Sequence, residues 1–348
     1  MDPVIGSDVE NYLDSDLPQI TPHRVMVLGA SGMLGSYVVE FLCEMARVTD
    51  KAIHLVAVSR RSSRYLQGLE THYKDVLHIV DYEKVPSMLA ASNGWLVVHA
   101  ASPASPDQYL GNEAGLIDAN VGLTLDVMRE LSRTGGHLTY FSSGEVYGPS
   151  PELPTREDTF SAFDHLGPRG CYGESKRAGE LIVKVFSDRS SARGSALRIY
   201  HTFGPGIDVN QSRIFSTVVK SVCEKTPILL RTAGEARRSF LYSADLVSAI
   251  LVTTAQDEFS AYNVAGETEM SIKEFAEIAS RLSGGASPVI TQNEDRSQTG
   301  SQIVESPIMR GIADTQRLRD LGWTPLVDVA EAIRRTVQSV QWRSLNGY

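Results

Sequence analysis

Residues 24–41 read RVMVLGASGMLGSYVVEF, and the fold can be predicted outward from this stretch. A β-branched run at 24–28 leads into Gly29, Gly32 and Gly35, and apolar residues at helical spacing follow. Glycines at such a turn let the backbone approach a pyrophosphate closely. The helix that follows offers free N–H groups and the positive end of its dipole. The stretch therefore predicts a strand, a phosphate-binding turn and a helix that together hold a dinucleotide.

The same alternation of strand and helix patterns continues for about 200 residues. We expect strands at 53–59, 76–80, 95–100, 137–143 and 196–202, and helices at 32–46, 117–132 and 172–186. Residues 95–100 are nearly all apolar, as in a strand that is buried on both faces. These patterns predict an α/β fold with a doubly wound, parallel Rossmann sheet.

The alternation weakens after residue 203, where the chain becomes rich in Gly, Ser, Pro and Arg. Helices are still expected at 271–283 and 329–342. We expect a smaller, interrupted C-terminal substrate domain over the carboxyl edge of the sheet, where ligands of open α/β sheets bind. The predicted division is a polar lead-in at 1–22, a dinucleotide-binding domain at 23–203 plus about 242–262, and the substrate domain at about 204–241 and 263–348.

Composition excludes several classes of protein. The 348 residues include 42 acidic and 33 basic side chains, so the net charge is -9. An acidic chain without a basic block is a poor nucleic-acid binder. No apolar run reaches the roughly 20 residues of a membrane helix, and the N-terminus lacks the apolar core of a signal peptide. The three cysteines lie far apart, without metal-ligand spacing. We expect a cytoplasmic protein that binds no nucleic acid, membrane or metal.

The end of the second predicted strand bears on the choice of cofactor. Ser59, Arg60 and Arg61 stand where an acidic residue would accept hydrogen bonds from the ribose hydroxyls of NAD. The planar fork of arginine suits a 2′-phosphate, so NADP is favoured over NAD. The alternative is that these arginines are solvated loop charges. Asp81, just past the third strand, is either an acceptor for the adenine amino group or a turn residue.

Tyr172 and Lys176 are the predicted catalytic pair. They are four residues apart on an expected helix, so the ammonium lies beside the phenol and favours its ionised form. Tyr172 can then act as a general acid or base. Ser142 and Ser143, at the end of the fifth strand, offer a hydroxyl that can hydrogen-bond a sugar hydroxyl. FSSGEVYG is not a nucleophile-elbow sequence, so no acyl transfer is expected.

GASGMLG, FSSGEVYG, YGESK and LRIYHTFGPG, in this order, resemble the extended short-chain dehydrogenase/reductases over about residues 24–340. More narrowly, they resemble the NAD(P)-dependent nucleotide-sugar epimerases, dehydratases and decarboxylases. HAASPASPDQY is similar to the UDP-glucuronate decarboxylase group, and VSRRSS to the GDP-mannose 4,6-dehydratases, which use NADP. With the residues above, the resemblance gives a predicted cofactor set: Gly29, Ser31, Gly32, Met33, Leu34, Gly35, Ser59, Arg60, Arg61, Asp81, Tyr82, Ala100, Ala101, Ser102, Asn120, Tyr172 and Lys176.

The resemblance implies that a bound cofactor oxidises C4 of a nucleotide-linked sugar while Tyr172 takes the hydroxyl proton. Ser143 occupies the catalytic Ser/Thr position, and Glu145 matches an acid of dehydratases and decarboxylases. A 4,6-dehydratase ranks first, ahead of a decarboxylase of NDP-glucuronate, a 4-epimerase and an NADPH-dependent 4-ketoreductase. A distant alternative is a non-catalytic NADP-sensing regulator. The family also implies a homodimer, paired through helices near 116–132 and 172–187.

The chain departs from the family pattern at four positions. Gly144 stands in place of the Asp of glucose-type dehydratases and also of the Ser of decarboxylases, although Glu145 and Arg238 match the decarboxylases. His201 stands in place of an Asn, Gly206 in place of an Arg, and Arg231 where an aromatic ring often stacks on the base. A nucleoside diphosphate also needs cationic donors, and several arginines fall in the predicted substrate domain. The predicted substrate-binding residues are Ser143, Glu145, His201, Arg213, Arg231, Arg238 and Arg310.

Overall fold

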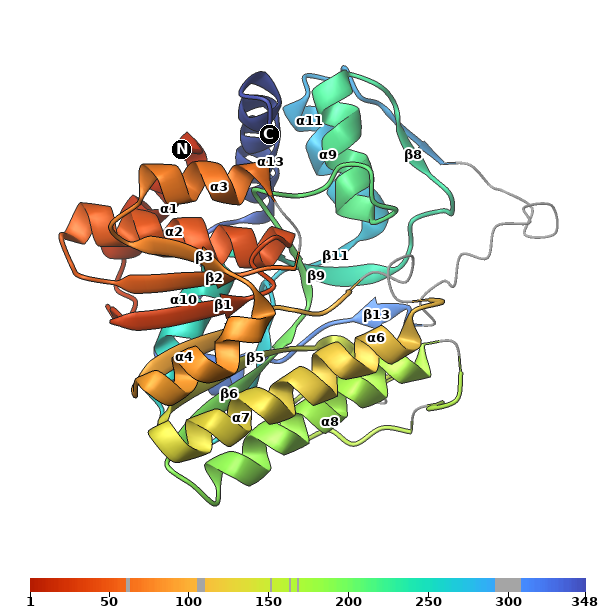
Figure 1. The fold of residues 1–348 in the computed structure, drawn as a ribbon. Coiled ribbons are helices and arrows are strands. Elements are labelled where there is room, and N and C mark those ends of the chain that lie inside the picture. The colour runs from red at the N-terminus through yellow and green to blue at the C-terminus, as the bar shows by residue number, and fades with distance from the viewer. Residues whose placement is uncertain (61–62, 105–109, 151, 163, 168, 292–307) are drawn as a thin grey trace.

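A seven-stranded, wholly parallel sheet forms the centre of the protein (Figure 1). The computed structural model describes residues 1–60, 63–104, 110–150, 152–162, 164–167, 169–291 and 308–348. The strand order is β10-β6-β5-β4-β1-β2-β3, which places the first strand of the chain inside the sheet, between β4 and β2. This confirms the predicted fold class, and the point where the strand order reverses lies beside β1. The strands are β1 (Arg24–Leu28), β2 (His54–Val58), β3 (Leu77–Val80), β4 (Trp95–His99), β5 (Gly136–Ser143), β6 (Ala192–Ile199) and β10 (Ser260–Val264).

Helices cover both faces of this sheet, which explains why β4 is buried along its whole length. One face packs against α2 (Met33–Thr49), α3 (Arg64–His72) and α10 (Ser243–Thr254). The other face packs against α4 (Val85–Ala91), α7 (Leu123–Thr134) and α8 (Gly170–Ser187), as Figure 1 shows. The carboxyl ends of the strands therefore form the open edge of the layer.

Two predicted elements are interrupted in the structure. The helix expected at 117–132 is divided into α6 (Glu113–Ile117), a π-helical turn (Asp118–Gly122) and α7. The strand expected at 196–202 begins earlier, at Ala192, and ends at Ile199. The N–H of Tyr200 still donates to Val264 of β10, but β7 (His201–Phe203) pairs instead with β9 (Arg237–Tyr242). His201 thus lies in a second sheet.

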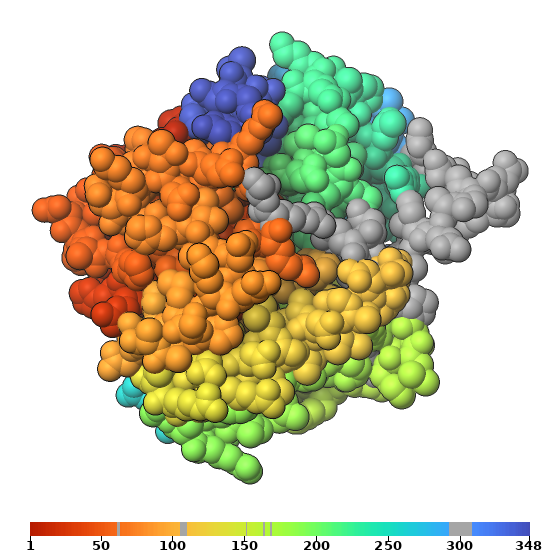
Figure 2. Space-filling model, in the orientation of Figure 1, coloured from red at the N-terminus to blue at the C-terminus, as the bar shows by residue number. Residues whose placement is uncertain are grey.

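The smaller part of the molecule is built around stacked and edge-on phenylalanines, among them Phe203, Phe240 and Phe275. Figure 2 shows its green and teal residues against the orange and yellow residues of the seven-stranded part, with the blue C-terminal helix between them. Residues 204–241, expected to be loop-rich, contain a helix and two strands. The elements besides β7 and β9 are α9 (Ile214–Glu224), β8 (Ile228–Leu230), β11 (Glu269–Ser271), α11 (Ile272–Leu282), β12 (Val289–Thr291), β13 (Arg310–Gly311), α12 (Gln316–Arg319) and α13 (Val329–Leu345).

Where the sequence predicts a polar lead-in, the structure has a buried helix, α1 (Pro3–Leu13). The side chain of Asp2 caps this helix, and Asp8 is almost wholly buried. The Asp8 carboxylate accepts hydrogen bonds from the Tyr37 hydroxyl at 2.6 Å and the Tyr242 hydroxyl at 2.8 Å, and it is paired with Arg335. Acidic residues suggest solvent exposure in the sequence, but Asp8 has these buried partners and Asp2 accepts a hydrogen bond from the buried Ser339 hydroxyl. Across the described ranges, none of the helices is long and apolar enough to cross a bilayer.

Candidate active site

The glycine turn between β1 and α2 has the geometry of a phosphate cradle. Gly29 has φ +81°, and a Cβ atom there would lie 2.7 Å from the backbone of Ala100 and Ala101. A Cβ on Gly35 would lie 2.2 Å from the Gly29 carbonyl oxygen. A Cβ on Gly32 would lie in van der Waals contact with the Gly29 carbonyl oxygen, at 3.4 Å, so packing constrains this position less than Gly29 and Gly35. Gly32 is exposed and provides no side-chain cap, so the first N–H groups of α2 can receive an anion.

The other predicted cofactor residues on this side lie around the ends of β2 and β3. Ser59 is buried and its N–H donates to Val80, whereas Arg60 and Asp81 are exposed. Tyr82 is half-buried, and burial raises the pKa of its phenol while the Gly29 backbone and the charge of Arg60 oppose that rise. Arg61 lies outside the described residues. Ser31 is exposed, and Met33 and Leu34 form the partly buried start of α2.

His99 organises the backbone at the end of β4. Its Nδ1 accepts from the N–H of Ala101 at 3.3 Å and its Nε2 donates to the carbonyl of Ala119 at 3.0 Å. Burial, with the nearby charge of Lys176, lowers the pKa of His99 to about 3, so the ring is neutral at physiological pH. The imidazole therefore ties the predicted cofactor segment at residues 100–102 to the π-helical turn that carries Asn120.

Asn120 is fully buried, and its side chain is only partly satisfied by the protein. Its amide donates to the Ser175 hydroxyl at 3.0 Å, but Oδ1 has no hydrogen-bond partner. A buried polar atom left without a partner is costly and is often found at a functional site. π-helical turns are likewise frequent at such sites. These observations fit the predicted place of Asn120 near the cofactor.

Tyr172 and Lys176 lie on α8, as predicted, and both are buried. The Lys176 ammonium donates to the carbonyl of Phe141 in β5 at 2.6 Å and lies 5.8 Å from the centre of the Tyr172 ring. Burial lowers the pKa of Lys176 to about 7, and the charge of Glu180 partly opposes this shift. Because β5 packs against α8, Ser143 at the end of β5 and Tyr172 in the first turn of α8 lie at the same edge of the sheet.

Sequence reasoning missed a buried ion pair behind these residues. Arg198 of β6 forms two hydrogen bonds to Glu180 of α8, at 3.0 and 2.7 Å, and Glu180 also accepts from the Ser142 hydroxyl. Glu180 lies one helical turn after Lys176. The pair therefore joins β6 to β5, which carries Ser143, and to α8, which carries Tyr172 and Lys176. Its sequence signal is an acid at the fourth position after the lysine, with an arginine on the next strand.

Glu145 forms a two-point ion pair with Arg169, a residue that the sequence did not single out. Arg169 Nη2 donates to Oε1 at 2.6 Å and Nε donates to Oε2 at 3.2 Å. The two side chains keep 22% and 17% of their exposed area, so solvent and small molecules can reach the pair. Glu145 directly follows Ser143 and Gly144 in a short 3-10 turn (Gly144–Tyr147), and Arg169 directly precedes α8. The pair thus lies between the two predicted catalytic elements.

Gly144, the position where dehydratases carry an Asp, is closely covered by an aromatic ring. A Cβ on Gly144 would lie 2.8 to 3.0 Å from ring atoms of Tyr200, which is a residue of the β6–β7 junction. A carboxylate cannot occupy this position unless Tyr200 moves. The second acid of a paired-acid dehydratase is therefore excluded by packing as well as by sequence.

Three arginines, Arg238, Arg213 and Arg169, place positive charge around the neutral ring of His201, and Glu145 lies within range of this charge. Arg238 Nε donates to His201 Nε2 at 3.1 Å. Burial lowers the pKa of His201 to about 3, with further lowering by the charges of Arg238, Arg213 and Arg169. The pKa of Arg238 is also lowered by burial, while the charge of Glu145 opposes the shift. The structure thus brings Glu145 together with three of the predicted substrate residues, His201, Arg213 and Arg238.

The remaining two predicted substrate residues lie elsewhere. Arg310 forms a two-point ion pair with Glu269 at 2.7 and 2.9 Å, and Arg237 pairs with the same carboxylate. Arg231 is exposed just after β8. Neither contributes to the charges that act on His201. Among the described residues, no three His, Cys, Asp or Glu side chains gather as a metal site.

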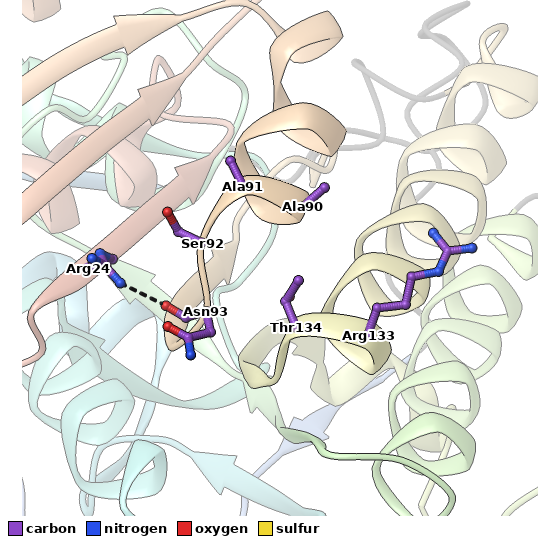
Figure 3. Close-up of a pocket in the computed structure, with 7 residues that line it drawn as sticks. All are labelled: Arg24, Ala90, Ala91, Ser92, Asn93, Arg133 and Thr134. Carbon is purple, nitrogen blue, oxygen red and sulfur yellow. Dashed lines mark hydrogen bonds between the residues drawn. The ribbon is translucent and has the colours of Figure 1, made fainter.

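A separate pocket lies at the opposite edge of the sheet, at the amino ends of the strands (Figure 3). It is lined by Arg24 at the start of β1, the loop of Ser92 and Asn93 before β4, and the end of α7. Arg24 donates to the Asn93 carbonyl at 3.1 Å. The guanidinium of Arg133 points away from Arg24 and Asn93 (Figure 3). The helix ends here are carboxyl ends, which repel anions. This pocket is therefore unsuited to a diphosphate ligand.

Residues 25–265 match the model of the NAD dependent epimerase/dehydratase family. The chain belongs to this family. The match spans more than half of the chain and includes the glycine turn, the Tyr172–Lys176 pair and the buried helix α10. The predicted family and the predicted type of enzyme are confirmed.

Curated relatives and solved structures within this family extend over most of the chain. UDP-glucuronic acid decarboxylase 1 of Xenopus tropicalis is 25% identical over 316 residues, which is 90% of this chain and 71% of the relative. UDP-glucuronic acid decarboxylase 1 of Arabidopsis thaliana is 24% identical, over 93% of this chain and 71% of the relative. The fold is shared with UDP-N-acetylglucosamine 4-epimerase of Methanobrevibacter ruminantium M1 (TM-score 0.79, 22% identity, 93% and 100% of the two chains). It is also shared with UDP-glucuronic acid 4-epimerase of Bacillus cereus (TM-score 0.74, 18% identity, 92% and 99%).

Proposed function

We propose that this protein oxidises C4 of a nucleoside-diphosphate uronic acid and then releases C6 as carbon dioxide. The observation that carries the proposal is the partly exposed Arg169–Glu145 pair beside Ser143, with Arg238 bonded to His201 within range of its charge, in a chain of net charge -9. A ligand with two phosphates and a sugar carboxylate needs such cationic donors. The UDP-glucuronic acid decarboxylases among the relatives act on a substrate of this class.

The first step uses the predicted catalytic pair. A nicotinamide cofactor, when bound, accepts the hydride from C4. Tyr172 takes the proton of the C4 hydroxyl, and the Lys176 ammonium stabilises the phenolate that must form first. Ser143 hydrogen-bonds the same sugar hydroxyl and orients it. The glycine turn, Asn120 and the residues at the ends of β2, β3 and β4 would hold the cofactor.

The second step follows from the position of the new ketone. The C6 carboxylate is β to the C4 carbonyl, so the C5–C6 bond can break with its electron pair moving to the carbonyl oxygen. Carbon dioxide leaves, an enolate remains, and C5 then takes up a proton to give a 4-keto pentose. Return of the hydride to C4, with a proton from Tyr172 to the C4 oxygen, would give the pentose, so the net change is loss of carbon dioxide. Cations beside the enolate oxygen lower the barrier by stabilising the charge that develops there. Lys176 and the protonated Tyr172 are the groups placed for this role.

A 4,6-dehydratase, the first-ranked prediction from sequence, is the second candidate because Glu145 stands at the family position for the base. Dehydration requires Glu145 to remove the C5 proton while the C6 hydroxyl leaves as water. Both carboxylate oxygens of Glu145 are engaged by Arg169, so the required base is held in an ion pair. These contacts favour decarboxylation over dehydration.

The test is to incubate the protein with UDP-glucuronate, UDP-glucose and GDP-mannose, each with NAD or NADP, and to measure product masses. Decarboxylation of UDP-glucuronate gives a product lighter by carbon dioxide. Loss of water from UDP-glucose or GDP-mannose would instead establish the dehydratase. Unchanged mass with an inverted C4 would establish a 4-epimerase, and stoichiometric consumption of NADPH a 4-ketoreductase. Any of these three results would overturn the proposal.

We also propose NADP as the cofactor, because Arg60 is exposed at the end of β2 and Tyr82 lies within reach of its charge. Arg60→Ala should weaken NADP binding about tenfold or more, as measured by calorimetry. The dissociation constant for NAD should stay within about twofold of the wild-type value. Arg64→Ala, at the start of α3, is the matched control. Equal losses for both cofactors would refute the assignment.

We further propose that the protein is a homodimer and that it has the two predicted domains, with β7 assigned to the smaller one. Ile117 on α6 and Leu181 and Val185 on α8 are apolar and exposed, at 46%, 61% and 37%. The helices that carry them lie side by side on the outer face (Figure 1). Leu181→Glu should convert a dimer into a monomer in light scattering after gel filtration, and a wild-type monomer would refute the proposal.

A further inference from the structure

The donor groups of Arg238 are already in use within the protein. Besides its bond to His201, Arg238 Nη1 donates to the carbonyls of Arg237 and Met309 at 2.8 and 3.1 Å, and Nη2 donates to that of Ile308 at 2.8 Å. An arginine has five N–H groups. Arg238 therefore adds charge to the site but cannot present its fork to a carboxylate without losing main-chain contacts.

Arg169, in contrast, already holds a carboxylate. Its Nε and Nη2 bind the two oxygens of Glu145 side by side, which is the arrangement that gives arginine its selectivity for carboxylates. The pair is partly exposed, and it lies within charge-interaction range of His201 and Arg238. A second carboxylate that enters this site can therefore compete with Glu145 for the same fork.

We propose that Arg169 is the residue that selects the uronate, by exchanging Glu145 for the C6 carboxylate of the sugar. This inference rests on the proposed function and names the residue that determines its substrate class. A sugar with a neutral C6 hydroxyl offers no negative charge to replace Glu145, so Arg169 stays in its internal pair. A uronate takes over the fork and leaves Glu145 beside Ser143 without that partner.

The exchange has an energetic consequence that can be measured. Glu145 competes with the ligand, so removing its charge strengthens uronate binding, whereas removing Arg169 weakens it. A neutral sugar is insensitive to both changes. A merely structural ion pair would change the affinity for charged and neutral sugars alike.

The experiment measures dissociation constants by calorimetry for the protein loaded with reduced cofactor, which cannot accept the C4 hydride, with UDP-glucuronate and UDP-glucose as probes. Arg169→Gln is expected to weaken the binding of UDP-glucuronate at least tenfold and that of UDP-glucose no more than twofold. Arg169→Lys keeps the charge but not the fork, and should recover part of the loss. Glu145→Gln should lower the dissociation constant of UDP-glucuronate severalfold. Arg156→Gln, a change in an exposed pair with Asp158, is the matched control and should alter neither affinity.

The outcomes separate this inference from the proposed function. If the wild-type protein releases no carbon dioxide from UDP-glucuronate, the proposed function fails. If it does so but Arg169→Gln lowers both affinities equally or neither, the role of Arg169 is refuted while the proposed function stands. Circular dichroism of each variant shows whether a loss reflects unfolding. A misfolded Arg169→Gln variant leaves Arg169→Lys to decide, because equal affinity changes for the two sugars in that variant also refute the inference.

Discussion

The seven-stranded part and the smaller part of the molecule hold their cationic side chains in different ways. At the edge of the large sheet, the Lys176 ammonium is buried against one carbonyl and two tyrosine rings. In the smaller part, Arg238 is bonded to three carbonyls and a histidine, and Arg310 to a glutamate. A motif thus predicts where a charge lies, but its neighbours decide whether that charge is available to a ligand.

The largest effect is expected at Tyr172, the proposed acid–base residue of the seven-stranded part. Tyr172→Phe removes the acid–base hydroxyl and should lower kcat about a hundredfold or more, while nucleotide-sugar binding changes little. Steady-state kinetics and calorimetry measure the two quantities. Tyr12→Phe is the control, since its hydroxyl bonds only within the N-terminal segment, to Pro18 and Ile20. A Tyr172→Phe enzyme with near-normal kcat would contradict the assigned role.

Burial of Lys176 should have a cost in stability that depends on pH. Its pKa is lowered from 10.5 to about 7 in the folded protein. Between these values the unfolded chain binds the extra proton, so the free energy of unfolding rises with pH across this range and is lowest below it. Lys176→Met removes the effect. The stability of the variant relative to the wild type should be greatest at pH 7 and fall by about 2 to 3 kcal/mol by pH 9.5.

Urea unfolding at both pH values measures this difference, and Lys184→Met, an exposed lysine on the same helix, is the control. The variant should also lose activity, since the phenolate of Tyr172 loses its cation. If the variant and the wild type differ in stability by the same amount at both pH values, the pKa of Lys176 is not lowered by burial.

Two glycine positions, one tightly packed in the glycine turn and one in open space, test how closely the turn is packed. Gly35→Ala places a Cβ 2.2 Å from the Gly29 carbonyl and should destabilise the fold by about 1 to 3 kcal/mol, with weaker cofactor binding. Gly122→Ala meets no atom within 4 Å and has no positive φ, so it should be neutral or slightly stabilising. Thermal unfolding with and without cofactor distinguishes them. Equal behaviour of the two variants would show that the turn is not tightly packed.

The smallest effect is expected at Arg310. Its pair with Glu269 is half exposed, and such pairs contribute little to stability. Arg310→Ala should change the affinity for UDP-glucuronate by less than about twofold and the free energy of unfolding by less than about 1 kcal/mol. Calorimetry and urea unfolding test this. A tenfold loss of affinity would return Arg310 to the substrate site, where the sequence had placed it.

Much of the large sheet could be predicted because its signals are local. Strand β1 matches the expected residues, and the glycine turn follows it where the alternation requires. The helix at 117–132 was predicted by apolar spacing, but its π-helical turn was not. That turn depends on His99 and Tyr140, whose side chains reach the carbonyls of Ala119 and Asn120 from other elements.

The smaller part could not be predicted as well, since its contacts join residues far apart in the chain. Helix α9 packs against α13, more than 100 residues further on, and its neighbours are rich in Gly and Ser. Arg169 was missed because its importance comes from Glu145, 24 residues earlier, rather than from any local pattern. The internal pairing of Arg310 could not be predicted for the same reason, since its partner Glu269 is 41 residues away.

The buried carboxylate of Asp8 has a consequence for how the enzyme handles its coenzyme. It joins Tyr37 on the helix that begins at the glycine turn to Tyr242 at the end of β9 and Arg335 on α13. These contacts hold the two parts of the molecule together along one side and oppose their separation there. We expect the dinucleotide to exchange slowly with bulk solution, so that a hydride taken from one sugar stays in the same protein until it is returned.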